Sequence, residues 1–180
     1  MTHSGLRVVC VGNDMRGDDA VGLVVARHLR ELVPEADVIE HSGEPADLLE
    51  ALGDGAEAVV LVDAVSSGAP PGEIHRIDAS EVALPFAASA STHGLGLAET
   101  IELGRALGCL PPQLLVYGIE GRAFELGAPL SPEVARAAGA VAAELRQLLE
   151  EAGTQSTLAA RAAGAYSGAG SSAARGAAGV

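Results

Sequence analysis

Apolar residues along the chain form two kinds of pattern, short continuous runs and stretches that repeat with the period of a helix. Residues 8–11 and 58–62 are continuous apolar runs, which are typical of strands buried on both faces of a parallel sheet. Residues 21–29 instead place Val and Leu on one side of a helix. The patterns predict strands at 7–12, 37–40, 58–62, 73–78 and 113–120, and helices at 19–32, 45–52, 93–107 and from 131 to about 150.

The order of these elements predicts an α/β fold, a three-layer α/β/α sandwich with a mostly parallel twisted sheet. Residues 73–78 alternate imperfectly, so we expect an edge strand or hairpin arm with His75 on its exposed face. Residues 1–150 are expected to form one domain. Residues 151–180 are rich in Gly, Ala and Ser and are expected to be a disordered tail, with a helical patch at 158–163 as the alternative.

The composition excludes several kinds of chemistry. Hydrophobic residues make up 48% of the chain but aromatic residues only 2%, so the core must consist of Val, Leu and Ala. A net charge of -13 and few aromatic rings argue against a nucleic-acid partner. All 11 basic residues are Arg, which excludes a Schiff-base lysine, a P-loop lysine and a Ser-Lys dyad.

The cysteines and the apolar stretches suggest where the protein acts. Cys10 and Cys109 form no CxxC motif, and Cys10 lies in an apolar run, so it is expected to be a core residue. Two isolated cysteines favour a reducing, cytoplasmic setting. The amino terminus shows no secretion signal, and no apolar stretch is long enough to cross a bilayer, so we expect no membrane association.

Three residues lie where the chemistry of such a fold is usually found. Asp19 opens the first helix, Asp63 ends the central strand, and His93 opens the third helix. In a parallel sheet all three would lie at the carboxyl edge, where ligands bind. Two carboxylates and one imidazole are a ligand set that suits a borderline divalent metal ion. The alternative is that these residues are ordinary helix caps and loop anchors.

Four linked motifs give the chain a family resemblance. The sequence has VGN at 11–13, DDAVG at 18–22, VDA at 62–64 and HGLGLA at 93–98. In this order and spacing, they resemble the hydrogenase maturation protease family over residues 6–150. The resemblance implies an endopeptidase that removes a C-terminal extension from the large-subunit precursor of a nickel–iron hydrogenase once nickel is in place. It also implies a monomer without an organic cofactor, acting on nickel that the precursor carries.

The resemblance assigns metal recognition and catalysis to Asp19, Asp63 and His93. Many members have Glu at the first of these positions, and Asp is one methylene shorter. Several members have an Asp-Gly-Gly-Thr-like turn where this chain has HSGE at 41–44, which leaves the preferred precursor open and gives His41 a possible substrate or metal role. Glu120, at the end of the last strand, is either part of the same site or a surface acid.

The sequence leaves the mechanism open. The metal either polarises the scissile carbonyl or lowers the pKa of a bound water, and either Asp63 or Asp18 takes the proton from that water. A nucleophilic Ser or Cys is disfavoured, because the chain has no GxSxG motif. The alternative function is a non-catalytic, metal-binding hydrogenase assembly factor on the same fold. A nucleotide-binding role is disfavoured, since the first loop lacks GxGxxG.

Overall fold

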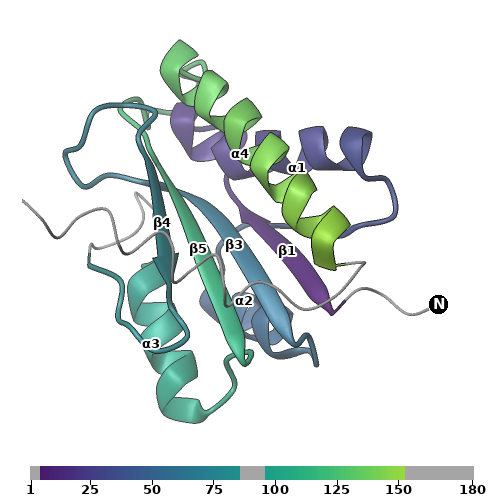
Figure 1. The fold of residues 1–180 in the computed structure, drawn as a ribbon. Coiled ribbons are helices and arrows are strands. Elements are labelled where there is room, and N and C mark those ends of the chain that lie inside the picture. Colours follow the sequence, from purple (N-terminus) through teal and green to yellow (C-terminus); the bar gives the residue numbers. More distant parts are fainter. Residues whose placement is uncertain (1–4, 86–95, 153–180) are drawn as a thin grey trace, which may run out of the picture.

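The described part of the protein forms a five-stranded sheet with helices on both faces (Figure 1). The computed structural model describes residues 5–85 and 96–152. The strand order is β2-β1-β3-β5-β4, and every neighbouring pair is parallel except β4 and β5. The strands are β1 (Leu6–Val11), β2 (Asp37–His41), β3 (Ala58–Val65), β4 (Ile74–Asp78) and β5 (Gln113–Glu120). The helices are η1 (Gly17–Ala20, a 3-10 turn), α1 (Val21–Leu32), α2 (Pro45–Gly53), α3 (Leu97–Leu107) and α4 (Pro132–Ala152).

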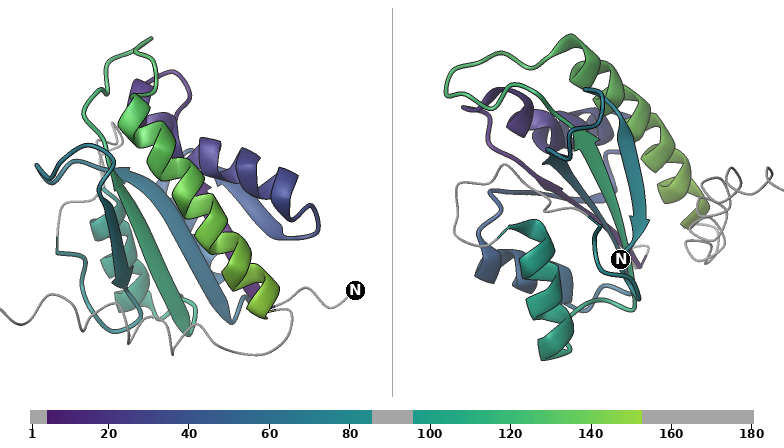
Figure 2. Two further views of the ribbon diagram at one scale, coloured as in Figure 1. Left: turned by 45° about the horizontal axis from the view of Figure 1, so that its top comes forward. Right: turned by 90° about the vertical axis from the view of Figure 1, so that its left-hand side faces the viewer.

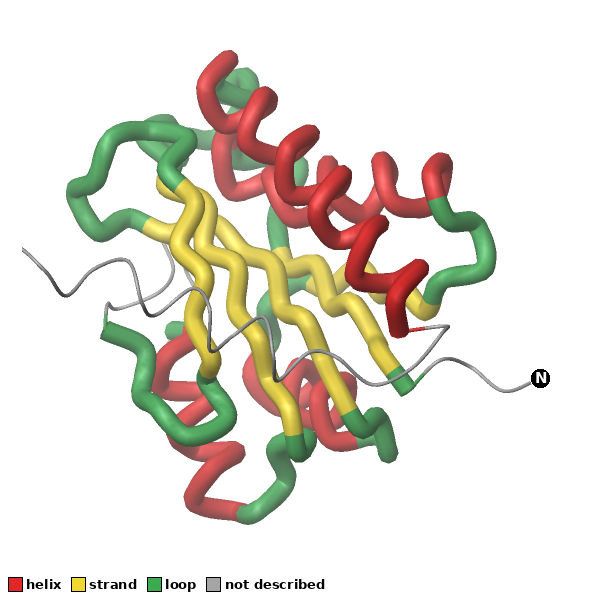
Figure 3. Tube along the Cα trace, in the orientation of Figure 1, coloured by secondary structure: helices red, strands yellow, loops and turns green. Residues whose placement is uncertain are grey.

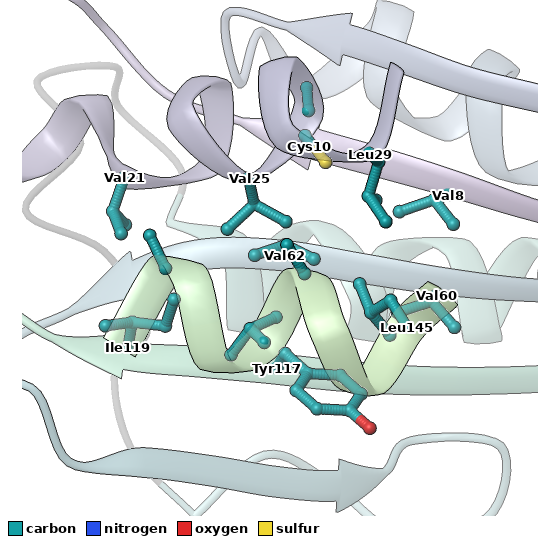
Figure 4. Packing of buried hydrophobic residues seen from close by; sticks show 14 of the residues in the cluster. Val8, Cys10, Val21, Val25, Leu29, Val60, Val62, Tyr117, Ile119 and Leu145 are labelled. Atoms are coloured by element: carbon teal, nitrogen blue, oxygen red, sulfur yellow. The ribbon is translucent and has the colours of Figure 1, made fainter. Parts of the chain in front are cut away.

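The helices form two layers, as the sequence predicts. Helices α1 and α4 cover one face of the sheet, and α2 and α3 cover the other (Figures 1 and 3). In the first layer, α1 places Val21, Val25 and Leu29 against the strands, in the same buried cluster as Cys10 of β1 (Figure 4). Each of these four residues is fully buried. The expected fold class is therefore confirmed.

Several element boundaries differ from the predictions. Strand β3 continues to Val65, because Ala64 and Val65 still pair with β5, so Asp63 lies inside the strand and not at its end. Asp19 lies in η1, ahead of the α-helix that it was expected to open. Helix α3 begins at Leu97 with Gly96 in the N-cap position.

The edge strand is confirmed, but the expected orientation of His75 is wrong. Among the strands that the structure describes, β4 pairs only with β5 and runs antiparallel to it. The His75 side chain is only 20% exposed, and it turns towards the buried carboxylate of Glu120. Within the described residues, no helix is both long and apolar enough to span a bilayer. Residues 151 and 152 of the predicted tail belong to the end of α4, and the rest of that tail and His93 lie outside the described ranges.

Candidate functional site

The loop after β1 is folded back on itself by backbone hydrogen bonds and carries Asp19. The N–H of Asn13 donates to the carbonyl of Asp19 at 3.0 Å, and the N–H of Asp19 donates to the carbonyl of Arg16 at 3.1 Å. The N–H of Gly12 donates to His41 at the end of β2, also at 3.0 Å. These contacts hold Asp19 at the carboxyl edge of the parallel strands, where the sequence places it.

Asp63 lies close enough to Asp19 for the two charges to interact. Both residues are buried, at 2% exposure for Asp63 and 8% for Asp19. Burial, and after it the negative charge of Asp19, raise the pKa of Asp63 well above its usual range. The N–H of Ala64 donates to Asp63 Oδ1 at 2.8 Å, and this hydrogen bond acts to lower the pKa of Asp63. Residues 44 positions apart in the sequence thus form a buried acidic pair that favours an added positive charge.

The third expected member of the site, His93, lies outside the described residues. The helix that follows it is described, and its first residue Leu97 packs with Leu61 and Val65 of β3. Side chains alternate along a strand, so Asp63 belongs to the same sheet face as Leu61 and Val65. The chain therefore enters α3 on the face of the sheet that carries Asp63. Among described residues, no three His, Cys, Asp or Glu form a metal-binding group.

Asp18 has a different environment from its neighbour Asp19. Its carboxylate accepts backbone hydrogen bonds from Arg122, Ala123 and Ser131 and a fourth from the Ser131 hydroxyl, at 2.6–3.0 Å. Burial alone would raise the pKa of Asp18, but these hydrogen bonds outweigh it and lower the pKa below its usual value. Asp18 is therefore an anchor between two loops and a poor proton acceptor. This environment does not favour Asp18 as the group that takes the proton from the attacking water, a role that the sequence left open between Asp18 and Asp63.

Glu120 is neither a surface acid nor a group left to bind a ligand. It is 1% exposed, and its carboxylate accepts hydrogen bonds from the N–H groups of Ser67 and Gly68 and from the Ser67 hydroxyl, at 2.8–2.9 Å. His75 Nε2 lies 3.4 Å from Glu120 Oε2. The carboxylate thus fixes the loop that follows β3. A charged residue at the end of a buried strand was the only sequence signal for this role.

His41 contacts the turn that it begins. Its Nδ1 accepts a hydrogen bond from the N–H of Gly43 at 2.9 Å. Burial lowers the pKa of His41, although Asp47 and Glu44 act to raise it. A neutral ring that accepts at Nδ1 carries its proton on Nε2, so it has no free lone pair for a metal ion in this conformation. The geometry supports a structural role in the turn more than a metal-binding one.

Cys10 is excluded as a nucleophile by its surroundings. The side chain is fully buried, and burial raises the pKa of its thiol to about 12. The thiolate, which is the reactive form, is therefore negligible near neutral pH. The prediction that Cys10 is a core residue is confirmed.

Fold and site together define an α/β protein with a buried pair of carboxylates at the carboxyl edge of a mixed sheet. A sequence model of the hydrogenase maturation protease family matches residues 23–148, well over half of the chain. The chain therefore belongs to the hydrogenase maturation protease family. The matched segment includes Asp63 and His93 and begins after Asp19.

Individual relatives agree with this assignment. The chain is 30% identical over 130 residues to the hydrogenase 2 maturation protease of Escherichia coli K12, covering 71% of this chain and 79% of the relative. It is similar to the crystal structure of the [NiFe] hydrogenase maturation protease HycI from Thermococcus kodakarensis KOD1, with a TM-score of 0.63 and 28% identity over 81% and 92% of the two chains. It is also similar to the hydrogenase maturating endopeptidase HybD from E. coli, with a TM-score of 0.66 and 25% identity over 82% and 93%.

Proposed function

We propose that this protein is the endopeptidase that removes the C-terminal extension of a [NiFe] hydrogenase large-subunit precursor after nickel has been inserted. The observation that carries the proposal is the buried acidic pair of Asp19 and Asp63. Two carboxylates that are distant in sequence lie together at the edge of the sheet where α/β proteins bind ligands. Relatives of the chain are named as proteases that mature hydrogenases.

In this proposal the precursor's nickel is recognised by Asp19, Asp63 and His93. The nickel belongs to the substrate, so its presence tells the enzyme that the precursor is ready for cleavage. The raised pKa of Asp63 supports this, because the acidic pair is stabilised by a bound cation, whether a proton or a metal ion. Carboxylates and imidazole are suitable ligands for nickel. Docking on the nickel would bring the scissile bond to the same edge of the sheet.

The environments of the two candidate bases favour Asp63 as the proton acceptor for the attacking water. The Asp18 carboxylate already accepts four hydrogen bonds, three of them from backbone N–H groups, which makes it a poor proton acceptor. Burial and the charge of Asp19 raise the pKa of Asp63, whereas hydrogen bonds from the 122–131 loop lower that of Asp18. The buried thiol of Cys10 gives no support to a cysteine-protease route.

The direct test is precursor processing followed by mass spectrometry. The protein is incubated with nickel-loaded and nickel-free precursor, and we expect a shortened product only from the nickel-loaded form. Equal cleavage of both forms would overturn nickel recognition. Tight association without a shortened product would favour the non-catalytic assembly factor instead. Asp63→Asn should abolish processing, and Asp54→Asn is the matched control, because the Asp54 side chain is 76% exposed and precedes β3 at the opposite edge of the sheet.

A further inference from the structure

Two loops at the carboxyl edge of the sheet are joined into one unit, here called the double loop, made of residues 13–18 and 121–131. The N–H of Gly127 donates to the carbonyl of Met15 at 2.8 Å, and the N–H of Asp18 donates to the carbonyl of Ala123 at 2.7 Å. The four hydrogen bonds accepted by the Asp18 carboxylate add to these. The two loops accordingly lie side by side in both views of Figure 2. These six hydrogen bonds hold the two loops together.

The two halves of the double loop are closely packed. Gly17 has a φ of +55°, and a Cβ at this position would collide with the carbonyl oxygen of Ala123 and lie 3.1 Å from the Ala128 side chain. A Cβ at Gly121 would lie 3.0 Å from the Cβ of Asp18. The backbones are therefore in direct contact.

The double loop presents two exposed apolar side chains, each preceded by an exposed acid. Met15 is 59% exposed and follows Asp14, and Leu126 is 75% exposed and follows Glu125. Leu126 is the most exposed large apolar residue in the described parts of the chain. The hydrogen bond from Gly127 to Met15 places both acid–apolar pairs on the same unit. Two large apolar side chains on loops that are hydrogen-bonded to each other offer apolar area that a partner can bury.

The double loop borders the acidic pair. Asp19 directly follows it, and the N–H of Gly121 donates to the carbonyl of Val65 at 2.9 Å, two residues after Asp63 in β3. The double loop thus lies next to the acidic pair at the carboxyl edge of the sheet.

We propose that the double loop is a docking surface for the precursor, and that it binds a segment in which an apolar side chain is flanked by Lys or Arg. This inference rests on the proposed function and names the partner's chemistry. Met15 and Leu126 would bury apolar area with little ordering of the backbone, because their loops are already joined by hydrogen bonds. Asp14 and Glu125 match basic side chains on the partner. Of the two arginines in the double loop, Arg122 is already paired with Glu133 at 3.6 Å and Arg16 is half-buried, so the exposed unpaired charge of the unit is acidic.

The test compares precursor binding and processing by wild type and the double variant Met15→Ser/Leu126→Ser. Full burial of two such side chains predicts a rise in KM and in Kd of about tenfold or more, with kcat unchanged. The matched control is Leu107→Ser, because Leu107 is 66% exposed but ends α3 at the opposite edge of the sheet. This control should process precursor like wild type. A second variant, Asp14→Asn/Glu125→Gln, should weaken binding and reduce its dependence on salt.

The outcomes separate this inference from the proposed function. If wild type cleaves the precursor and the Met15→Ser/Leu126→Ser variant has the same KM and Kd, the docking surface is overturned and the protease assignment stands. A fall in kcat with unchanged KM would also overturn docking. If wild type binds without cleaving and the variant binds about tenfold more weakly, docking is supported while the protease assignment fails. If wild type neither binds nor cleaves, both are overturned.

Discussion

Asp18 and Ser131 are joined by two hydrogen bonds across 113 residues of sequence, one from the Ser131 N–H to Asp18 Oδ1 at 2.6 Å and one from the Ser131 hydroxyl to Oδ2 at 2.9 Å. The contact ties the loop after β1 to the residue before α4. Asp19, the next residue along the chain, instead interacts with Asp63. Two adjacent acids therefore have separate roles: Asp18 anchors two loops, and Asp19 belongs to the acidic pair.

Asp18→Asn should destabilise the protein by about 3 kcal/mol. The asparagine side chain has an NH2 group in place of one carboxylate oxygen, and in this buried site that group would face the N–H and hydroxyl donors that now bind Asp18. The loss is measured as the change in free energy of urea unfolding at pH 7. Asp14→Asn, at an exposed position in the same loop, is the control and should change stability by less than about 0.5 kcal/mol.

The effect of Asp18→Asn should depend on pH in a defined direction. Hydrogen bonds lower the pKa of Asp18 in the folded state, so its stabilising contribution is present above the unfolded value of 3.8. It is lost as the pH falls through the lower folded pKa. The stability difference between wild type and variant should therefore shrink below about pH 4. A difference that stays constant down to pH 2 would contradict the anchoring role.

Asp63→Asn should abolish processing while leaving the protein as stable as wild type or more stable. The pKa of Asp63 is raised, so ionising it costs folding free energy, and the neutral amide removes that cost. The penalty is absent below the unfolded pKa of 3.8 and grows as the pH rises towards the folded pKa. Unfolding measured from pH 4 to 8 should show the gain in stability increasing with pH, and activity should fall by at least about 100-fold.

The fold was predictable because its signals are local. Buried parallel strands must be almost entirely apolar, so β1 and β3 stand out in the sequence. Strand β5 matches the prediction at both ends, and Pro132 begins α4 as expected of proline in a first helical turn. The polar residues that follow the apolar runs of β1 and β3 likewise predicted that Asp19 and Asp63 lie at the same edge of the sheet.

The roles of the buried acids were not predictable, because they depend on contacts between distant segments. Nothing near Asp18 in the sequence indicates that residues 122–131 donate to it. Asp63 was expected at a strand end because a charge rarely continues a buried strand, yet Ala64 and Val65 extend β3 beyond it. The orientation of His75 is set by Glu120, which lies 45 positions further along the chain.

Glu120→Ala should destabilise the protein by about 3 kcal/mol, because it leaves the N–H groups of Ser67 and Gly68 and the Ser67 hydroxyl without their acceptor. Glu120→Gln should cost less than about 1 kcal/mol, since the amide oxygen still accepts both N–H groups and the hydroxyl can rotate. Thermal unfolding of both variants measures the difference. Equal losses would show that the charge, and not the hydrogen-bond geometry, holds the loop after β3.

Two glycine-to-alanine substitutions should have opposite effects on stability. A Cβ at Gly22 would overlap the carbonyl oxygen of Val11, where α1 crosses the end of β1, whereas a Cβ at Gly139 in α4 meets nothing within 4 Å. Gly22→Ala should therefore destabilise by about 3 kcal/mol or more, because backbone atoms must move. Gly139→Ala should stabilise by about 0.5–1 kcal/mol, because alanine is the better helix former. Urea unfolding of both variants provides the measurement, and a neutral Gly22→Ala would contradict the close packing of α1 on β1.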